Sequence, residues 1–164
     1  MCLIVFAYDS HPNYRLIFAA NRDEFYSRPT EPAKIWEDHP GILAGRDLEQ
    51  MGTWLGITGE GRFSAVTNYR SPAHAKKEAE SRGRLVSGYL SGVLEPYEYL
   101  EQIKKKSRLY NPFNLLAGDK TCLYYYSTFG KGVERVTPGI HGLSNHLLDT
   151  PWPKVIKAKQ ALYE

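Results

Sequence analysis

Cys2 is the residue whose type and position most directly predict chemistry. An initiator methionine is normally removed when the second residue is small, and removal of Met1 would give Cys2 a free α-amine. The pKa of an α-amine is about 8, so part of it is neutral near pH 7 and can accept the proton of the thiol. One residue would then supply both nucleophile and base, whereas retention of Met1 would remove that base. The competing interpretation is that Cys2 is a small buried side chain at the start of a strand. Judged from Cys2 alone, this structural interpretation is favoured.

A polar segment, Asn21 to Glu24 with the sequence Asn-Arg-Asp-Glu, follows directly on the apolar run from Leu16 to Ala20. A turn-rich stretch, residues 9–13, separates that run from the apolar residues 1–8, and this pattern predicts a hairpin of two strands. The second strand of a hairpin returns to the beginning of the first, so the polar segment is expected beside Cys2. There a carboxylate could hold the protonated α-amine, and a guanidinium could favour the thiolate. The alternative is a polar loop with ion pairs at the surface.

Two asparagines follow predicted strands elsewhere in the chain. Asn68 comes after the run Arg62 to Thr67, and Asn145 comes after the run Ile140 to Ser144. A side-chain amide at the end of a strand can donate a hydrogen bond to a developing oxyanion, but it can equally cap a turn. Each asparagine alone favours the turn cap, whereas the pair together with Cys2 and the acidic segment favours a catalytic site.

The histidines and glycines match no metal or cofactor motif. The five histidines are His11, His39, His74, His141 and His146. Their spacing gives neither H-x-x-x-H nor H-E-x-x-H, so no metal site is predicted. His141 and His146 are nevertheless close enough to Asn145 in sequence to line the same site. The glycines of Gly52 to Gly56 lack the Lys-Ser/Thr pair of a phosphate loop, and no cofactor is predicted.

The composition is that of a globular protein and excludes several classes of function. The 164 residues are 42% hydrophobic and 13% aromatic, which suits one domain spanning residues 1–164. The net charge of +3 is too small to indicate nucleic-acid binding. No apolar run approaches the roughly 20 residues of a membrane span, and the N-terminus is not a secretory signal. With only two cysteines, a reduced cytoplasmic protein is expected. Either function considered below implies a small-molecule substrate or ligand.

The order of the predicted elements indicates an α+β fold with a largely antiparallel sheet. After the first hairpin, the prolines of residues 28–40 predict a loop. Further strands are predicted over residues 41–46, 53–58, 62–67, 113–117, 122–127, 133–136 and 140–144. Helices are predicted over residues 85–93, from Pro96, and from Thr150-Pro151 to the last residue.

Together these residues resemble the NRDE family, also called the transport and Golgi organisation protein 2 family. The motifs that carry the resemblance are Met1 to Ile4, Asn21 to Glu24, Gly52 to Gly56, Thr67 to Arg70 and Gly142 to Asn145. The resemblance implies a fold similar to that of N-terminal-nucleophile (Ntn) hydrolases, a four-layer αββα sandwich of mostly antiparallel sheets. Members of the family are longer than this chain, and the last helix has no stop signal. We therefore expect residues 1–164 to be most of a single domain, incomplete at its C-terminus.

A more distant resemblance is to the choloylglycine hydrolase and penicillin V acylase group, in which an N-terminal cysteine attacks an amide. The site residues it implies are Cys2, Asn21, Arg22, Asp23, Asn68 and Asn145. Cys2 would attack and Asp23, helped by Arg22, would orient its α-amine. The two later asparagines would stabilise the oxyanion, and Asn21 matches the asparagine of the Arg-Asn-x-Asp segment of that group. Ala20 stands where the acylases carry an arginine, so Arg22 is the candidate replacement.

Two functions follow from the sequence. The first is Cys-dependent hydrolysis of a carbon–nitrogen amide bond in a small molecule. The second is a non-catalytic protein on the same scaffold that binds or transports haem or lipid, with which the family is associated, or a domain whose site is vestigial. Haem would then be held by His11, His141, His146 or a cysteine, and Ala20 favours this second function. The sequence leaves the substrate and the oligomeric state open.

Overall fold

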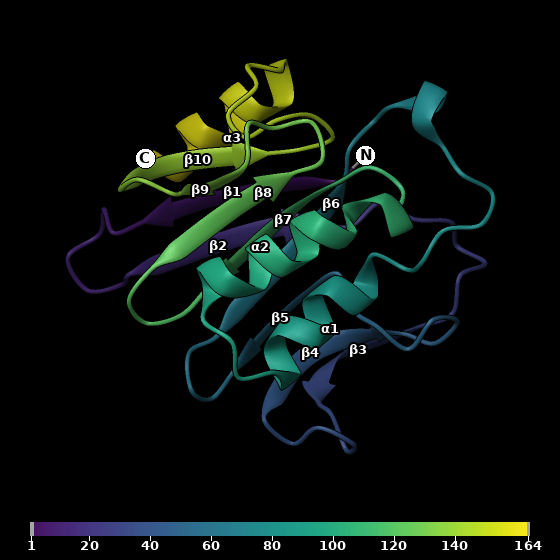
Figure 1. Cartoon of the computed structure of the whole chain (residues 1–164). Helices are drawn as coiled ribbons and strands as arrows, with labels where there is room; N and C mark the ends of the chain where they lie inside the picture. Colours follow the sequence, from purple (N-terminus) through teal and green to yellow (C-terminus); the bar gives the residue numbers. More distant parts are fainter. Residues whose placement is uncertain (1, 164) are drawn as a thin grey trace.

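The computed structural model describes residues 2–163, and within this range the chain forms ten β-strands and three α-helices (Figure 1). In chain order they are β1 (Leu3–Tyr8), β2 (Leu16–Asn21), β3 (Thr30–Ile35), β4 (Ile42–Asp47), β5 (Leu55–Thr58), β6 (Phe63–Asn68), α1 (Gly83–Ser91), α2 (Pro96–Lys106), β7 (Phe113–Gly118), β8 (Leu123–Ser127), β9 (Val133–Arg135), β10 (Gly139–Leu143) and α3 (Pro153–Tyr163). None of these helices is both long and apolar enough to cross a membrane.

The strands form two antiparallel sheets, one with the order β10-β1-β2 and one with the order β3-β4-β5-β6-β7-β8-β9. Apolar side chains such as Phe6, Phe63 and Leu116 join the two sheets in a common core. Helices α1 and α2 pack on the seven-stranded sheet, while α3 packs on β1 and β10 (Figure 1). The predicted α+β class with mostly antiparallel sheets is therefore confirmed.

The first hairpin is the element that places Cys2. β1 is buried along almost its whole length because one face meets the seven-stranded sheet and the other meets α3. Its pairing with β2 sets Leu3 opposite Asn21 and Tyr8 opposite Leu16. The polar segment that follows β2 consequently lies beside Cys2, as the hairpin pattern predicts.

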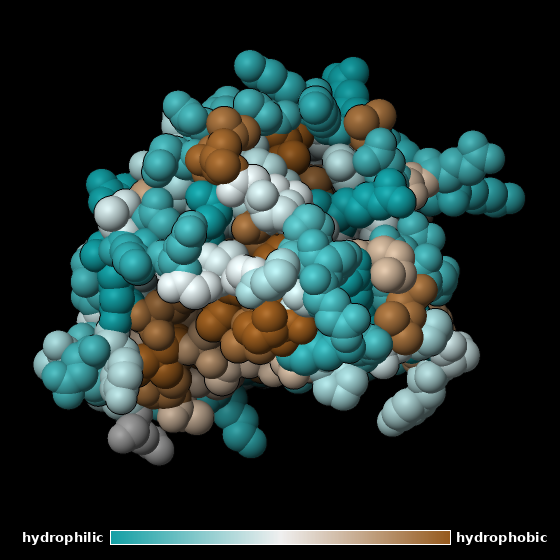
Figure 2. All heavy atoms as spheres, turned by 90° about the horizontal axis from the view of Figure 1, so that it is seen from below, coloured by the Kyte–Doolittle hydropathy of each residue, from teal (hydrophilic) through white to brown (hydrophobic). Residues whose placement is uncertain are grey.

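Hydrophobic side chains remain exposed where the seven-stranded sheet extends beyond β2. Ile35, Leu43 and Ile57 occupy paired positions on β3, β4 and β5, and each is more than a third exposed. Figure 2, which views the molecule from below, shows hydrophobic side chains gathered in a band between hydrophilic groups. The seven-stranded sheet is thus covered by the three-stranded sheet over only part of its width.

The prediction of a loop over residues 28–40 is wrong, because β3 occupies Thr30–Ile35. β3 is the outermost strand of its sheet and is bordered by β4 on one side. The backbone N–H and C=O groups on its other side therefore form no hydrogen bonds within the sheet. The register shifts between Glu31 and Lys34, on either side of Pro32. An edge strand with such an irregularity tolerates a proline, which has no N–H to donate.

The predicted start of the last helix at Thr150-Pro151 is also wrong, because α3 begins at Pro153. The hydroxyl of Thr150 donates to the carbonyl of Leu147 at 2.8 Å, which closes a turn ahead of the helix. The carbonyl of Trp152 accepts from the N–H of Val155 at 2.9 Å. Pro153 therefore takes the first helical position, where its missing N–H costs nothing.

A buried polar network around Asn114 of β7 ties the segment after β10 to the seven-stranded sheet. The amide nitrogen of Asn114 donates to the carbonyl of His146 at 2.9 Å and to the hydroxyl of Thr67 at 3.1 Å. The hydroxyl of Thr67 donates to the carbonyl of Ser144 at 2.7 Å, and the hydroxyl of Tyr125 donates to the amide oxygen of Asn114 at 2.8 Å. Buried polar groups of this kind are costly to leave unpaired.

We expect Asn114→Ala to lower the free energy of unfolding by about 3 kcal/mol, because several buried groups lose their partner. Urea unfolding followed by circular dichroism measures the change. Asn13→Ala, in the exposed turn before β2, is the matched control and should shift stability by less than about 0.5 kcal/mol. Equal effects of the two substitutions would contradict a structural role for the network.

Candidate functional site

Cys2 lies where two clefts meet. The first cleft has a volume of about 1040 Å³ and the second about 460 Å³, sizes that suit small molecules. Both clefts are lined by Cys2, Asp23, Asn68, Arg82 and Asn111. Because both clefts reach Cys2, a ligand in either one can approach its thiol.

The backbone of Cys2 is held by side chains from the far end of the chain. The hydroxyl of Ser144 donates to the carbonyl of Cys2 at 2.7 Å, and the ammonium of Lys154 donates to it at 3.3 Å. The N–H of Asp23 points at the sulfur, with the nitrogen 3.5 Å from Sγ. The sequence did not single out Ser144 or Lys154, although Ser144 stands inside the motif Gly142 to Asn145.

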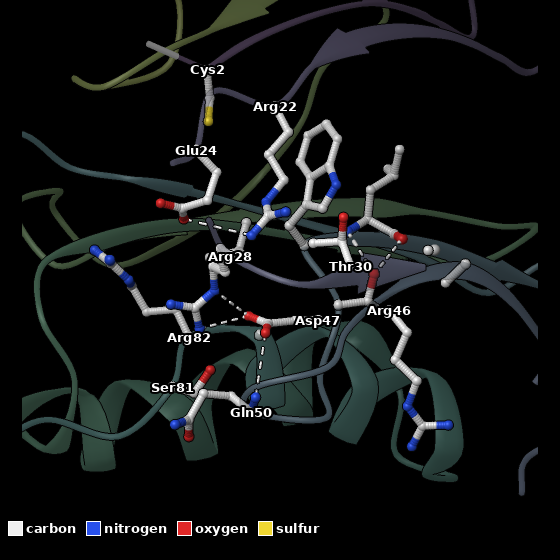
Figure 3. Close-up of a pocket in the computed structure, with 18 of the residues that line it drawn as sticks. Cys2, Arg22, Glu24, Arg28, Thr30, Arg46, Asp47, Gln50, Ser81 and Arg82 are labelled. Carbon is white, nitrogen blue, oxygen red and sulfur yellow. Dashed lines mark hydrogen bonds and ion pairs between the residues drawn. The ribbon is translucent and has the colours of Figure 1, made fainter. Parts of the chain in front are cut away.

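Burial dominates the electrostatics of the thiol and raises the pKa of Cys2 above its ordinary value. The positive charges of Arg22 and Lys154 act in the opposite direction, and the carboxylate of Glu24 adds to the rise. Arg22 also forms an ion pair with Glu24 at 3.5 Å, which weakens its effect on the sulfur (Figure 3). The thiol is therefore protonated at neutral pH and needs a base before it can attack.

Five of the six residues predicted for the site line the clefts. Arg22 lines the first cleft and Asn145 the second, while Cys2, Asp23 and Asn68 line both. The sixth, Asn21, lies at the exposed end of β2 and is absent from both linings.

The two later asparagines contact each other. The amide nitrogen of Asn145 donates to the backbone carbonyl of Asn68 at 2.9 Å, and the carbonyl of Asn145 accepts from the N–H of Arg70 at 2.8 Å. Asn145 therefore fixes the position of Asn68 with the amide that was expected to face an oxyanion. Asn68 is exposed at the end of β6, within both clefts.

Arg82 lines both clefts although no sequence motif predicts it there. It is half-buried directly before α1, and its guanidinium donates to the carbonyl of Pro112 at 3.1 Å. Burial lowers its pKa, whereas the nearby Glu24 and Cys2 raise it. Figure 3 shows its side chain in the cleft on the same side as Glu24. No local pattern marks this arginine, because only the packing of α1 on the sheet brings it to Cys2.

The wall of the first cleft is an ion-pair network around Arg28. Its guanidinium lies 2.7 Å from the carboxylate of Asp47 (Figure 3). It also lies 3.1 Å from the carboxylate of Glu49. Burial acts to raise the pKa of Asp47. The hydrogen bonds from Arg28 and from two backbone N–H groups outweigh this effect, so the pKa of Asp47 lies below its ordinary value. Both charges of the pair are therefore retained at neutral pH.

The two histidines expected to line the site do not reach the clefts. His146 is held between the hydroxyls of Tyr69 and Thr150, each 3.0 Å from one ring nitrogen. His141 lies 2.7 Å from the carboxylate of Asp149, and this hydrogen bond raises the pKa of His141. These contacts anchor the chain between β10 and α3.

The fold and the clefts define a class of protein: an α+β protein of two antiparallel sheets that presents the thiol of its second residue where two clefts meet. A family model described as Transport and Golgi organisation 2 matches residues 1–164. The chain belongs to this family, and the resemblance in sequence is confirmed.

Known relatives cover the whole chain. It is 43% identical over 179 residues to the Transport and Golgi organization 2 homolog of Mus musculus, and 43% identical over 177 residues to the Transport and Golgi organization protein 2 homolog of Homo sapiens. The Transport and Golgi organization protein 2 of Drosophila melanogaster is 31% identical over 179 residues, with 98% of this chain and 63% of that protein covered. The matches to the two mammalian relatives cover 100% of this chain and 64% of each relative.

We expect alkylation of Cys2 by iodoacetamide to rise with pH around a midpoint above the ordinary thiol value of about 8.5, because burial raises the pKa of the thiol. The measurement uses the Cys122→Ser variant, so that Cys2 is the reacting thiol, with an N-terminal tag ahead of Met1 so that Met1 is retained. The same variant unfolded in urea is the control. A midpoint at or below that of the unfolded control would show that the folded site favours the thiolate instead.

Proposed function

We propose that the chain is an Ntn-hydrolase-like protein that hydrolyses the amide bond of a small molecule through Cys2. The observation that carries this proposal is the position of the thiol at the junction of two clefts, beside Asp23 and Asn68. The succession of helix, sheet, sheet and helix supports an αββα sandwich. Because the mammalian relatives are longer, we further propose that residues 1–164 are most of one domain.

The chemistry begins with removal of Met1, which gives Cys2 an α-amine. The amine takes the proton of the thiol as the sulfur attacks the carbonyl carbon of the amide. The carbon–nitrogen bond then breaks, and the departing amine takes the proton from the ammonium. Water attacks the resulting thioester with the α-amine as base, which releases a carboxylic acid and restores the thiol.

The surrounding residues are assigned distinct roles in this reaction. The side-chain amide of Asn68 donates to the oxyanion of the tetrahedral intermediate. Asn145 holds the backbone of Asn68 and acts as a positioning residue. The carboxylate of Asp23 orients the α-amine, and the N–H of Asp23 favours a thiolate on the sulfur.

A second candidate is a non-catalytic protein that binds a ligand in the same clefts. The raised pKa of the thiol and the alanine at position 20 favour it. The names of the relatives refer to transport and Golgi organisation, which also fits a carrier. Haem held by the predicted histidines does not fit, because His11, His141 and His146 are all absent from the cleft linings. If this second function is the true one, the wild type binds a ligand in the clefts but hydrolyses no amide.

The test is a screen of N-acyl amides with the wild type and three variants. Cys2→Ala should abolish turnover, and Asn68→Ala should lower kcat about 100-fold because an oxyanion donor is lost. Cys122→Ala removes the other cysteine, lies outside the clefts, and should retain wild-type kcat/KM. Turnover that survives in Cys2→Ala would overturn the proposed nucleophile.

A further inference from the structure

We propose that Arg82 forms an anion subsite beside Cys2 that takes the carboxylate of a small-molecule ligand. Its use by a substrate rests on the proposed hydrolysis, whereas the subsite itself rests on the charges and contacts of Arg82. The subsite lies where the two clefts meet, so a bound carboxylate would stand next to the thiol.

Arg82 differs in its pairing from the other arginines of the first cleft. Those arginines form ion pairs with neighbouring carboxylates: Arg22 with Glu24 at 3.5 Å, Arg28 with Asp47 at 2.7 Å and Arg46 with Asp38 at 2.6 Å. Within residues 2–163, the guanidinium of Arg82 forms no ion pair with a carboxylate. Its charge is thus available to a ligand in the cleft.

The guanidinium of Arg82 is also held in place. One of its nitrogens donates to the carbonyl of Pro112, while its backbone joins the first turn of α1. A guanidinium carries five N–H donors in a planar fork that matches a carboxylate, and most of these remain free of the Pro112 contact. The first turn of α1 contains no acidic residue, so the positive end of the helix dipole adds to the same field.

The balance of charge in the cleft selects the kind of anion. Four arginines line the first cleft, and its acidic lining residues are Asp23, Glu24, Glu31, Asp47, Glu49 and Glu80. A dianionic phosphate would meet this excess of negative charge with only one unpaired guanidinium. A single carboxylate requires one guanidinium and is the better match.

The test compares two thiol reagents of the same shape, iodoacetate and iodoacetamide, which differ in the charge of one group. Both react with Cys2 in a Cys122→Ser background, so the ratio of their rates cancels changes in the pKa or exposure of the thiol. At fixed pH and ionic strength, Arg82→Gln should lower the iodoacetate-to-iodoacetamide ratio about fivefold. Arg82→Met, which keeps the apolar stem, gives the same test if the glutamine variant fails to fold.

Two controls locate the effect at Arg82. Arg84→Gln removes an equal charge from an exposed position on α1 and should leave the ratio unchanged. Arg82→Lys keeps the charge and should retain most of the wild-type ratio. An unchanged ratio in Arg82→Gln, or an equal fall in Arg84→Gln, would overturn the subsite. Alkylation requires no amide turnover, so this result is independent of whether Cys2 hydrolyses amides.

Discussion

The site depends on the hydrogen bonds that tie the segment after β10 to both sheets. Ser144 donates to the carbonyl of Cys2, directly before β1 of the three-stranded sheet, while its own carbonyl accepts from Thr67 in the seven-stranded sheet. Asn114 holds the next turn of this segment through the carbonyl of His146. Because these polar groups are buried, their need for partners fixes how the two sheets meet at Cys2. The two clefts open at that junction.

Burial and the nearby positive charges have opposite effects on the pKa of the Cys2 thiol. The desolvated surroundings of Cys2 raise its pKa, and the positive charges of Arg22 and Lys154 offset this rise only in part. In the proposed reaction the base is the α-amine of the same residue, so the proton would leave as the sulfur attacks and no long-lived thiolate would be required. Arg82, the unpaired arginine of the junction, is then free to contact an anionic group of the ligand.

Features with local patterns could be predicted from the sequence. The apolar runs on either side of a turn predicted the hairpin that brings Asp23 to Cys2, and the strand-end position of Asn68 predicted its place in the clefts. β3 was not predicted, because an edge strand tolerates the prolines that usually indicate a loop. Arg82 and the contact of Asn145 with Asn68 depend on packing between distant elements, which no local pattern encodes.

Intact mass spectrometry of the purified wild type, before and after incubation with p-nitrophenyl acetate, tests whether Cys2 is a nucleophile activated by its own α-amine. In samples quenched with acid at short times, the protein is expected to lack Met1 and to carry one acetyl group as a thioester on Cys2. Retention of Met1 throughout the sample, or acetylation at another residue with Cys2 unmodified, would contradict a nucleophile activated by its own α-amine.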